Sequence, residues 1–242
     1  FSSRVKDLKI ILHGDNVERL AKSLIALSKE GVFSRESLEE LSGFKGSLID
    51  SFLDSLLSEG VLVKVGDGYK SSLPPHRLIK YFMEKGLNVD LEELSGLLPW
   101  DEFEALIRLI FEEWGFRVVS RLRVPAMGTR VEFDVIAFKE PRVLLIEAKR
   151  WRRISSSISM IVEKHLKKVE LVSRKPEVLM NRLGVRWGEA LLIPIIITWH
   201  KIAMQVIDGM PIVSIYQVNS FIMELDAIID RIRIFKVSWS RL

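Results

Sequence analysis

The chain has 242 residues, a formal net charge of +4 and no cysteine. The lack of cysteine excludes disulfide bonds and cysteine-based metal sites or nucleophiles. The longest apolar run, Ala190–Trp199, is shorter than the about 20 residues that a membrane-spanning helix needs. With no visible signal peptide, we expect a cytoplasmic protein that is not inserted in a membrane. Asn and Gln are scarce beside Lys, Arg and Glu, a bias typical of thermophile proteins.

Residues 1–75 predict three helices followed by a hairpin. Apolar residues at helical spacing predict helices over 17–29, from Ser34 or Ser37 to 43, and over 48–58, with glycines after each. The hairpin consists of Val61–Val65, the turn Gly66-Asp67-Gly68 and a second short strand at Tyr69-Lys70. Three helices and a hairpin in this order resemble a winged helix-turn-helix.

The partner of this N-terminal region stays open between two alternatives. The third helix, which reads DNA in many winged helices, offers Asp50, Asp54 and the following Glu59, and acidic groups there repel phosphates. The region is therefore either a DNA reader that uses the wing residues Lys64 and Lys70, or a domain that contacts another protein.

Leu73-Pro74-Pro75 is a stiff break and predicts a domain boundary after residue 75. We expect a helical linker over 76–100, with helical patterns at 77–85 and 91–98, and a second domain over 101–242.

The second domain predicts a mixed-sheet α/β core with helices on its faces. A helix over Glu102–Trp114 and a strand over Phe116–Val124 come first, and Pro125–Arg130 is expected as a turn. The further elements are strands at 131–138 and 143–149, a helix from about 155 to 173, an apolar strand at 190–198 that carries a bulge or lies at an edge because of its proline, a hairpin around Asp208-Gly209, a helix over 219–230 and a strand at 234–239.

Acidic side chains interrupt two of these apolar strands. If side chains alternate strictly, Asp134 shares a face with Ile136 and Phe138, while Phe133 points to the other face. In the next strand Glu147 and Lys149 project together, and pairing of the two strands as a hairpin brings Asp134 beside Glu147. Charges in apolar surroundings cost free energy unless they are paired or hold a metal, and Mg²⁺ prefers oxygen ligands. Two carboxylates and a lysine are the groups needed for metal-assisted hydrolysis of a phosphodiester.

The motif Asp134, twelve intervening residues and Glu147-Ala148-Lys149 resembles the signature of the PD-(D/E)xK nuclease superfamily. The preceding helix, which contains Glu104, and the Gly-Phe-x-Val strand after it are similar to the opening of archaeal Holliday-junction resolvases and Mrr-type restriction endonucleases. The resemblance covers about residues 100–242. One departure is the basic run directly after the Glu-x-Lys triplet, which is heavier than the signature needs.

The resemblance implies a restriction-endonuclease-like core and a catalytic site that uses Mg²⁺ or Mn²⁺. The metal would be held by Asp134, Glu147 and the Ala148 carbonyl, with Lys149 positioning the attacking water. Glu104 would assist, although the spacing Asp101-x-x-Glu104 also fits a helix capping box. A homodimer is a further expectation from this family.

Basic residues are concentrated near the motif. Residues 141–190 contain twelve Lys or Arg and five Glu, whereas residues 1–75 contain ten Lys or Arg and eleven Asp or Glu. A basic stripe beside a carboxylate cluster is typical of a surface that binds a phosphate backbone. The residues expected to bind nucleic acid are Arg130, Arg150, Arg152, Arg153, Lys164, Lys167 and Lys168. His165 is expected to be a semi-buried core histidine, and the four histidines show no zinc-site spacing.

Phosphate-loop, dinucleotide-binding and serine-hydrolase motifs are absent from the sequence. We therefore expect a two-domain, Mg²⁺-dependent DNA endonuclease, acting on particular DNA structures in repair or recombination, or in restriction. Its expected partners are DNA, a second copy of the chain and a protein bound by the N-terminal domain. The alternatives are a catalytically silent nuclease fold that binds DNA or protein, and a winged-helix transcription regulator.

Overall fold

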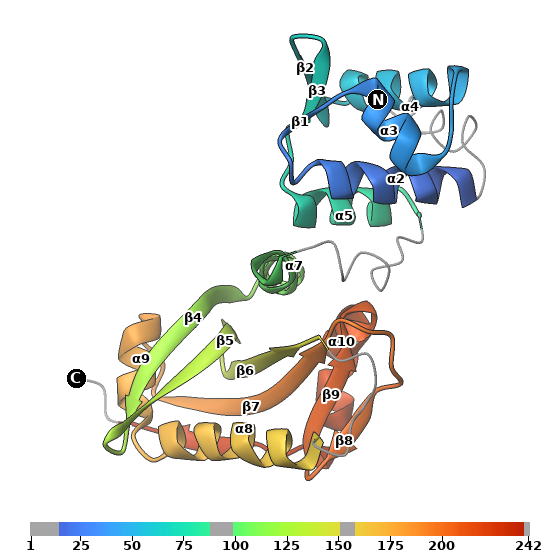
Figure 1. The fold of residues 1–242 in the computed structure, drawn as a ribbon. Coiled ribbons are helices and arrows are strands. Elements are labelled where there is room, and N and C mark those ends of the chain that lie inside the picture. Colours follow the sequence, from blue (N-terminus) through green and yellow to red (C-terminus); the bar gives the residue numbers. More distant parts are fainter. Residues whose placement is uncertain (1–14, 88–98, 151–157, 240–242) are drawn as a thin grey trace. The chain divides into compact units, whose positions relative to one another are not determined.

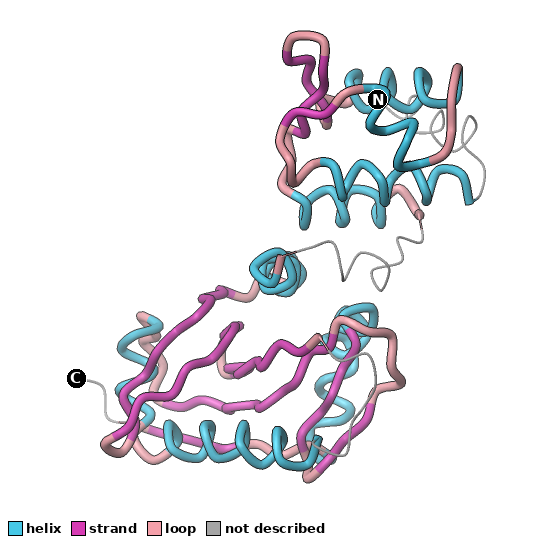
Figure 2. Tube along the Cα trace, viewed as in Figure 1, coloured by secondary structure: helices cyan, strands magenta, loops and turns pink. Residues whose placement is uncertain are grey.

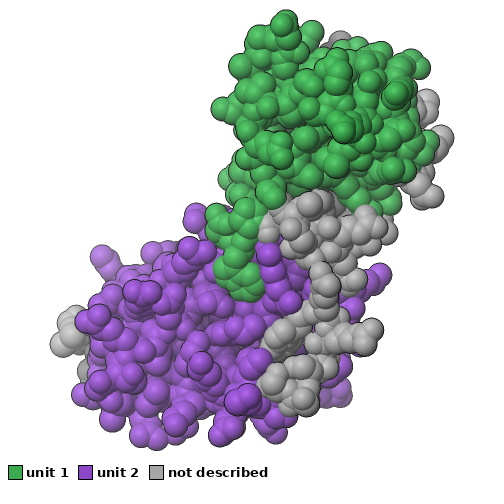
Figure 3. Space-filling view, viewed as in Figure 1, with its two compact units in different colours: residues 1–102 green, residues 103–242 purple. Residues whose placement is uncertain are grey.

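The computed structural model describes residues 15–87, 99–150 and 158–239. The chain forms two compact units, residues 1–102 and 103–242 (Figure 3). Within the described ranges, no helix is long and apolar enough to cross a membrane.

The first unit is a small helical domain with a three-stranded sheet. Its elements are α2 (Asp15–Leu27), β1 (Val32–Phe33), α3 (Arg35–Ser42), α4 (Ser47–Ser58), β2 (Leu62–Val65), β3 (Gly68–Ser71) and α5 (Pro75–Glu84). The helix signals act as expected: the Ser34 side chain accepts a hydrogen bond from the Ser37 N–H at 3.1 Å and caps α3. Gly43 ends that helix in the left-handed conformation, with φ of 74°.

The sheet and the last helix of this unit extend what the sequence predicts. The strand order is β1-β3-β2, so β1, which the sequence analysis did not identify, completes the hairpin into a sheet. Helix α5 packs inside the unit, where the Phe82 ring stacks on Phe52 with centroids 6.2 Å apart. The sequence assigned α5 to a linker over 76–100, but the first unit extends to residue 102. The helical pattern expected at 91–98 lies outside the described residues.

The second unit contains a seven-stranded mixed sheet flanked by helices, the α/β architecture that the sequence predicts (Figures 1 and 2). Its elements, with α7 beginning just before the unit boundary, are α7 (Trp100–Glu113), β4 (Arg117–Ala126), β5 (Thr129–Lys139), β6 (Arg142–Lys149), α8 (Ile158–Ser173), α9 (Pro176–Leu183), β7 (Glu189–Thr198), β8 (Gln205–Ile207), β9 (Met210–Ser214), α10 (Val218–Ile228) and β10 (Phe235–Ser238), with single-turn 3₁₀ helices at Ile215–Gln217 and Ile229–Arg231.

The sheet order is β4-β5-β6-β7-β9-β8, and β10 pairs with the beginning of β7. Strands β4, β5 and β6 run antiparallel, whereas β6, β7 and β9 run parallel. The apolar strand β7 is interior, so the expected edge position is wrong. Pro194 is accommodated because it lies between Leu192, where the β10 pairing ends, and Ile196, where the β9 pairing begins. Among the described strands, none pairs with Pro194 on that side, so the missing N–H is not needed there.

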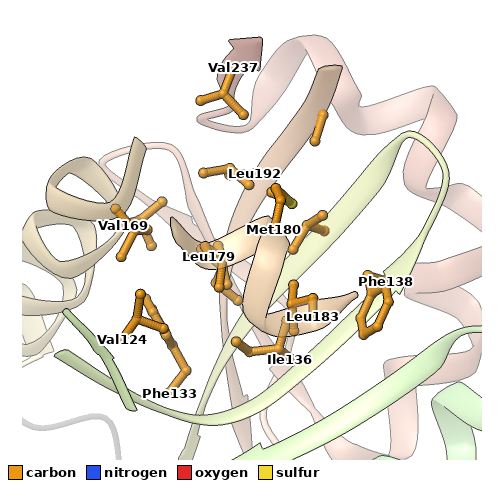
Figure 4. Packing of buried hydrophobic residues seen from close by; sticks show 14 of the residues in the cluster. Val124, Phe133, Ile136, Phe138, Val169, Leu179, Met180, Leu183, Leu192 and Val237 are labelled. Carbon is orange, nitrogen blue, oxygen red and sulfur yellow. The ribbon is translucent and has the colours of Figure 1, made fainter. Parts of the chain in front are cut away.

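Helices α8 and α9 close one face of the sheet. Their buried side chains, among them Val169, Leu179 and Met180, pack against Phe133 and Ile136 of β5 (Figure 4). In Figure 1, α7 lies on the opposite side of the sheet from α8. One surface of the sheet therefore faces α8 and the other faces α7. Glu104 of α7 contacts Arg121 on β4, and Lys168 of α8 contacts Glu147 on β6.

The turn between β4 and β5 is tighter than expected. The sequence assigned 125–130 to a turn, but both strands continue to Ala126 and Thr129, leaving the two-residue turn Met127-Gly128. Both residues have positive φ values, 48° and 81°, the geometry of the two-residue turns whose twist matches that of a hairpin.

Candidate functional site

The candidate site lies where β5 and β6 separate. Their pairing runs from Lys139↔Arg142 to Val135↔Ile146, and the next position in register would place Asp134 opposite Glu147. There the Asp134 Oδ2 atom accepts a hydrogen bond from the Ala148 N–H at 2.8 Å. A carboxylate thus replaces a backbone acceptor at the end of the ladder. The expected juxtaposition of Asp134 and Glu147 is present in the structure.

The backbone is unusual on the other side of Asp134. Strand β4 pairs with β5 on both sides of this point, at Ser120↔Val135 and Leu122↔Phe133, but Arg121 and Asp134 do not form a pair. Arg121 has a φ of 53°, a left-handed conformation that is uncommon for residues other than glycine. Such a residue inside a strand interrupts the regular pleat.

The side-chain alternation of β5 breaks at the same place. The sequence analysis put Phe133 and Ile136 on opposite faces, but both belong to one hydrophobic cluster against α8 and α9. That expectation is wrong because strict alternation requires a regular pleat, and the pleat is interrupted between Phe133 and Ile136. The interruption leaves Asp134 directed towards β6 rather than into either core.

Two lysines hold the Glu147 carboxylate. The Lys149 Nζ atom donates to Oε1 at 2.7 Å, and the Lys168 Nζ atom, from α8, donates to Oε2 at 2.8 Å. Lys168 also donates to the Glu132 carbonyl oxygen at 3.1 Å. Lys168 therefore links β5 and β6 across the point where they separate.

His165, one turn before Lys168 on α8, also faces Glu147. Its Nε2 atom lies 2.9 Å from the Leu145 carbonyl oxygen, and because that oxygen can only accept, Nε2 carries a hydrogen. The Nδ1 atom lies 3.5 Å from Glu147 Oε2 and has no hydrogen-bond partner among the described residues. The ring is 1% exposed, so its orientation is fixed by packing, and it contacts the site as well as the core.

Glu104 approaches the site from α7. It is 5% exposed, and its Oε2 atom accepts a hydrogen bond from Arg121 Nε at 2.8 Å. The left-handed Arg121 thus connects the separating strands to α7. Glu104 is close enough to Asp134 to contribute to the rise of the Asp134 pKa.

The two central carboxylates have opposite pKa shifts. Burial, followed by repulsion from Glu147, raises the pKa of Asp134, and the Ala148 N–H and Lys149 offset only part of this rise. Burial also opposes the ionisation of Glu147, but contacts from His165, Lys149 and Lys168 outweigh it and hold the pKa of Glu147 well below its usual range. Glu147 is therefore a stable anion, whereas Asp134 lacks a full complement of positive charge.

The donor chemistry partly fits a hard divalent cation. Asp134 and Glu147 offer carboxylate oxygens, which such ions prefer, and the raised pKa of Asp134 is the kind of repulsion that a cation relieves. However, within the described residues no group of three or more Asp, Glu or His side chains is arranged to hold a metal ion. Each Glu147 oxygen already accepts a hydrogen bond from one ammonium group, so a metal ion would either use the lone pairs that remain or displace one of the lysines.

The basic residues predicted to bind nucleic acid occupy different surroundings. Arg130 is exposed and lines a hollow of about 520 Å³ together with Lys175. Lys164 and Lys167 are exposed on α8, whereas Lys168 is directed to Glu147. Arg150 lies over the Trp199 ring, 5.4 Å from its centroid. The remaining two, Arg152 and Arg153, lie outside the described residues.

Sequence reasoning missed three features of the site. Arg121 was not singled out, His165 was assigned to the core, and Lys168 was assigned to phosphates rather than to Glu147. A weak signal existed for two of them: residues three apart share a helix face, so His165 beside the apolar stripe of α8 places Lys168 near the sheet. No sequence pattern indicated the left-handed conformation of Arg121.

Comparisons with known proteins give little. No family model matches the sequence, and no curated protein matches it. Solved structures with some likeness include a protein of unknown function, AF1548 (19% identity, TM-score 0.29, covering 41% of this chain and 47% of that one). A second is VC1899 from Vibrio cholerae, with 8% identity and a TM-score of 0.39, covering 94% of this chain and 53% of that one. A third is Can2 from Sulfobacillus thermosulfidooxidans in complex with cyclic tetra-adenylate, with 10% identity and a TM-score of 0.31, covering 93% of this chain and 53% of that one. The chain spans about half the length of these structures, and the TM-scores are too low to carry an argument.

Proposed function

We propose that the chain is a metal-dependent deoxyribonuclease of the PD-(D/E)xK type, acting on DNA phosphodiesters. The observation that carries the proposal is the meeting of Asp134, Glu147 and Lys149 at the separation of two otherwise apolar strands, with the Ala148 N–H on Asp134. Unpaired carboxylates in such surroundings cost free energy, so a purely structural protein gains nothing from the raised pKa of Asp134.

Each residue has a role that follows from its position. Asp134 and Glu147 would hold Mg²⁺ or Mn²⁺, which would polarise a phosphoryl oxygen and lower the pKa of a bound water. Lys149 lies on the same strand as Glu147. It would orient the attacking water once its ammonium group has left the Glu147 oxygen. Glu104, fixed by Arg121 at 2.8 Å, would hold a water on the α7 side. Exposed Arg130, Lys164 and Lys167 would contact phosphates outside the site.

The first unit supports a winged-helix assignment through its element order, α2-β1-α3-α4-β2-β3, and its sheet order, β1-β3-β2. Its α4 exposes Asp50 and Asp54, and Asp50 is engaged by Arg35 of α3 at 2.8 Å. We infer that this helix contacts a protein rather than DNA, because its acidic surface would repel phosphates.

A second candidate is a silent nuclease fold that binds DNA or protein without cutting. The engagement of both Glu147 oxygens by lysines favours it, because the carboxylate needs no metal to be neutralised. The two candidates differ in whether cutting depends on Asp134.

The test is a cleavage assay with Mg²⁺ or Mn²⁺ on labelled duplex, single-stranded, flap and four-way-junction DNA. We expect metal-dependent cutting by the native chain and a loss of at least about a hundredfold in the Asp134→Ala and Glu147→Ala variants, the size of effect typical of a catalytic group. Glu132→Ala is the matched control, since Glu132 lies two residues from Asp134 on β5 but pairs with the exposed Arg123.

The outcomes separate the candidates. Cutting that is lost in the two site variants and kept by Glu132→Ala supports the nuclease. Binding of DNA without cutting at any metal concentration, unchanged by Asp134→Ala, supports the silent module. Binding of duplex DNA by the first unit alone would instead support the transcription regulator.

A further inference from the structure

Lys168 occupies a position at Glu147 that a cation could take. Its ammonium group lies 2.8 Å from Glu147 Oε2, nearly as close as Lys149 lies to Oε1. It comes from a different element, α8, and its second hydrogen bond, to the Glu132 carbonyl, reaches the neighbouring strand. Its side chain is 21% exposed, so this ion pair is partly shielded from water and salt.

At Glu147 the negative charge is compensated without any added ion, because the ammonium groups of Lys149 and Lys168 both contact this one carboxylate. A divalent cation that bound Glu147 would place two further positive charges beside these lysines. Excess charge in a half-buried site is unfavourable unless an anion accompanies the cation.

We propose that Lys168 takes the place of a divalent cation at Glu147, so that the cation binds tightly only together with an anionic partner, a DNA phosphodiester. This inference rests on the proposed function, because it assumes that Glu147 is a metal ligand. Lys168 is then a positioning residue: it keeps Glu147 in place and β5 and β6 at a fixed separation when the metal is absent, and it is displaced when metal and phosphate arrive together.

A structural role alone predicts the opposite sign for metal affinity. If Lys168 only supported the strands, its neutralisation would disorder Glu147 and weaken metal binding. If Lys168 competes with the metal, Lys168→Gln tightens metal binding in the absence of DNA. The tightening should be at least about tenfold, the low end of the one to three decades by which a neighbouring unit charge shifts an ionic equilibrium. The same variant should lose most of the increase in metal affinity that DNA produces in the native chain.

The experiment is a titration of the full chain with Mn²⁺, followed by the loss of the free-ion electron paramagnetic resonance signal. It is run without DNA and with a short phosphorothioate duplex, which keeps the negative charges and resists hydrolysis, and Mn²⁺ bound by the duplex alone is subtracted. Lys168→Met serves as a second neutral variant in case Lys168→Gln does not fold, and Lys168→Arg keeps the charge and should behave like the native chain. Arg174→Gln, at an exposed basic residue directly after α8, should leave Mn²⁺ affinity without DNA unchanged.

The result separates this inference from the proposed function. Tighter Mn²⁺ binding by the neutral variants without DNA, and a smaller effect of DNA, supports the inference, whether or not the chain cuts DNA. Unchanged or weaker Mn²⁺ binding by the neutral variants overturns the inference but leaves a metal-dependent nuclease in place. Binding of Mn²⁺ by neither the native chain nor the variants, with or without DNA, overturns both.

Discussion

Asp134 combines half-burial with two neighbouring carboxylates, and both raise its pKa. A group whose pKa is raised on folding binds its proton more tightly in the native state than in the unfolded chain. Its contribution to stability is therefore most favourable below its ordinary pKa of 3.8 and declines as the pH rises above that value. Ionisation of Asp134 therefore costs the folded protein stability, because burial and the two neighbouring carboxylates disfavour its charged form.

Replacement of Asp134 by Asn should therefore stabilise the protein while abolishing cleavage. The amide oxygen can still accept the Ala148 N–H, and the repulsion from Glu147 disappears. We expect a gain of about 1 kcal/mol at pH 7 and a smaller gain near pH 4, where the native Asp134 is more protonated. Thermal unfolding of both proteins at the two pH values measures this. A variant less stable than the native chain at pH 7 would show that Asp134 is adequately compensated as it stands.

Glu147 should behave in the opposite way. Its pKa lies below the ordinary 4.5, so its ion pairs stabilise the protein above that pH and this stabilisation is lost as the pH falls through the range below 4.5. The Glu147 side chain is 12% exposed, and we expect Glu147→Gln to cost about 2–3 kcal/mol at pH 7, because it leaves lysines near a neutral group. Urea denaturation at pH 7 and pH 3 measures the cost, which should shrink on acidification. An equal cost at both pH values would show that the charge of Glu147 is not what stabilises it.

Arg121 allows the backbone and side-chain contributions at the site to be separated. Both Arg121→Ala and Arg121→Gly remove the ion pair with Glu104, but only glycine adopts the φ of 53° without strain. The glycine variant should therefore be the more stable of the two by about 1 kcal/mol, as measured by urea denaturation. Equal stabilities would mean that the strand relaxes once the side chain is gone.

At the residue scale, the sequence predicted the site in part. Period-two alternation placed Glu147 and Lys149 together, and hairpin pairing placed Asp134 beside Glu147, because both depend on neighbours along the chain. The roles of His165 and Lys168 depend on how α8 lies across the sheet, which periodicity does not determine. The conformation of Arg121 opposes its own local preference, and it occurs where the pairing of β4 with β5 is interrupted.

At the element scale, the cap of α3 and the β8–β9 turn were predicted correctly because their signals are local, whereas the turn expected at 125–130 is shorter in the structure. Ser34, Gly43 and Asp208-Gly209 mark the boundaries of α3 and the β8–β9 hairpin where the structure has them. The two-residue strand β1 and the helix α9 were missed. Strand β1 is too short to show alternation. Helix α9 (Pro176–Leu183) lies after the helix expected to end at about residue 173, in a segment to which the sequence analysis assigned no element.

Gly128 and Gly209 have nearly the same positive φ but different surroundings. Their alanine variants therefore separate the cost of the backbone strain from the cost of a close contact made by the added Cβ. Gly128 has a φ of 81° and open space where a Cβ would be, whereas at Gly209, with a φ of 80°, a Cβ would lie 2.9 Å from the Arg233 Cβ. Arg233 also donates its N–H to the Gly209 carbonyl at 2.6 Å, so that segment cannot move away freely. We expect Gly128→Ala to cost about 1 kcal/mol and Gly209→Ala about 2 kcal/mol or more.

The comparison is made by chemical denaturation of the two variants under identical conditions. Since the φ penalties are matched, the difference between the costs reports the close approach of Arg233 to the β8–β9 turn. Equal costs would mean that the Arg233 segment adjusts without loss of stability.

At the scale of the whole molecule, the two units differ in charge and in core. The first unit has its own core around α2, α4 and α5, and the second has a core between the sheet and its helices. The basic excess over 141–190 belongs to the second unit, which also holds the whole candidate site. The sequence predicted a domain boundary after residue 75, but Pro74 and Pro75 begin α5, and the first compact unit runs to residue 102.

This division predicts that cleavage and DNA binding reside in the second unit. A fragment of residues 99–242, which keeps α7 complete, should fold alone and retain the metal-dependent cleavage rate of the full chain within about threefold, a change of less than 1 kcal/mol in the barrier. Its salt dependence should also match that of the full chain, because each phosphate contact contributes about −0.9 to the slope of log Kobs against log salt and the first unit adds none.

A fragment of residues 15–87 should fold but should not retard duplex DNA in a gel-shift assay, because exposed Asp50 and Asp54 on α4 oppose Lys64 and Lys70. If instead the slope became less steep by two or more on removal of the first unit, its lysines would be DNA contacts and the acidic helix would face away from the duplex.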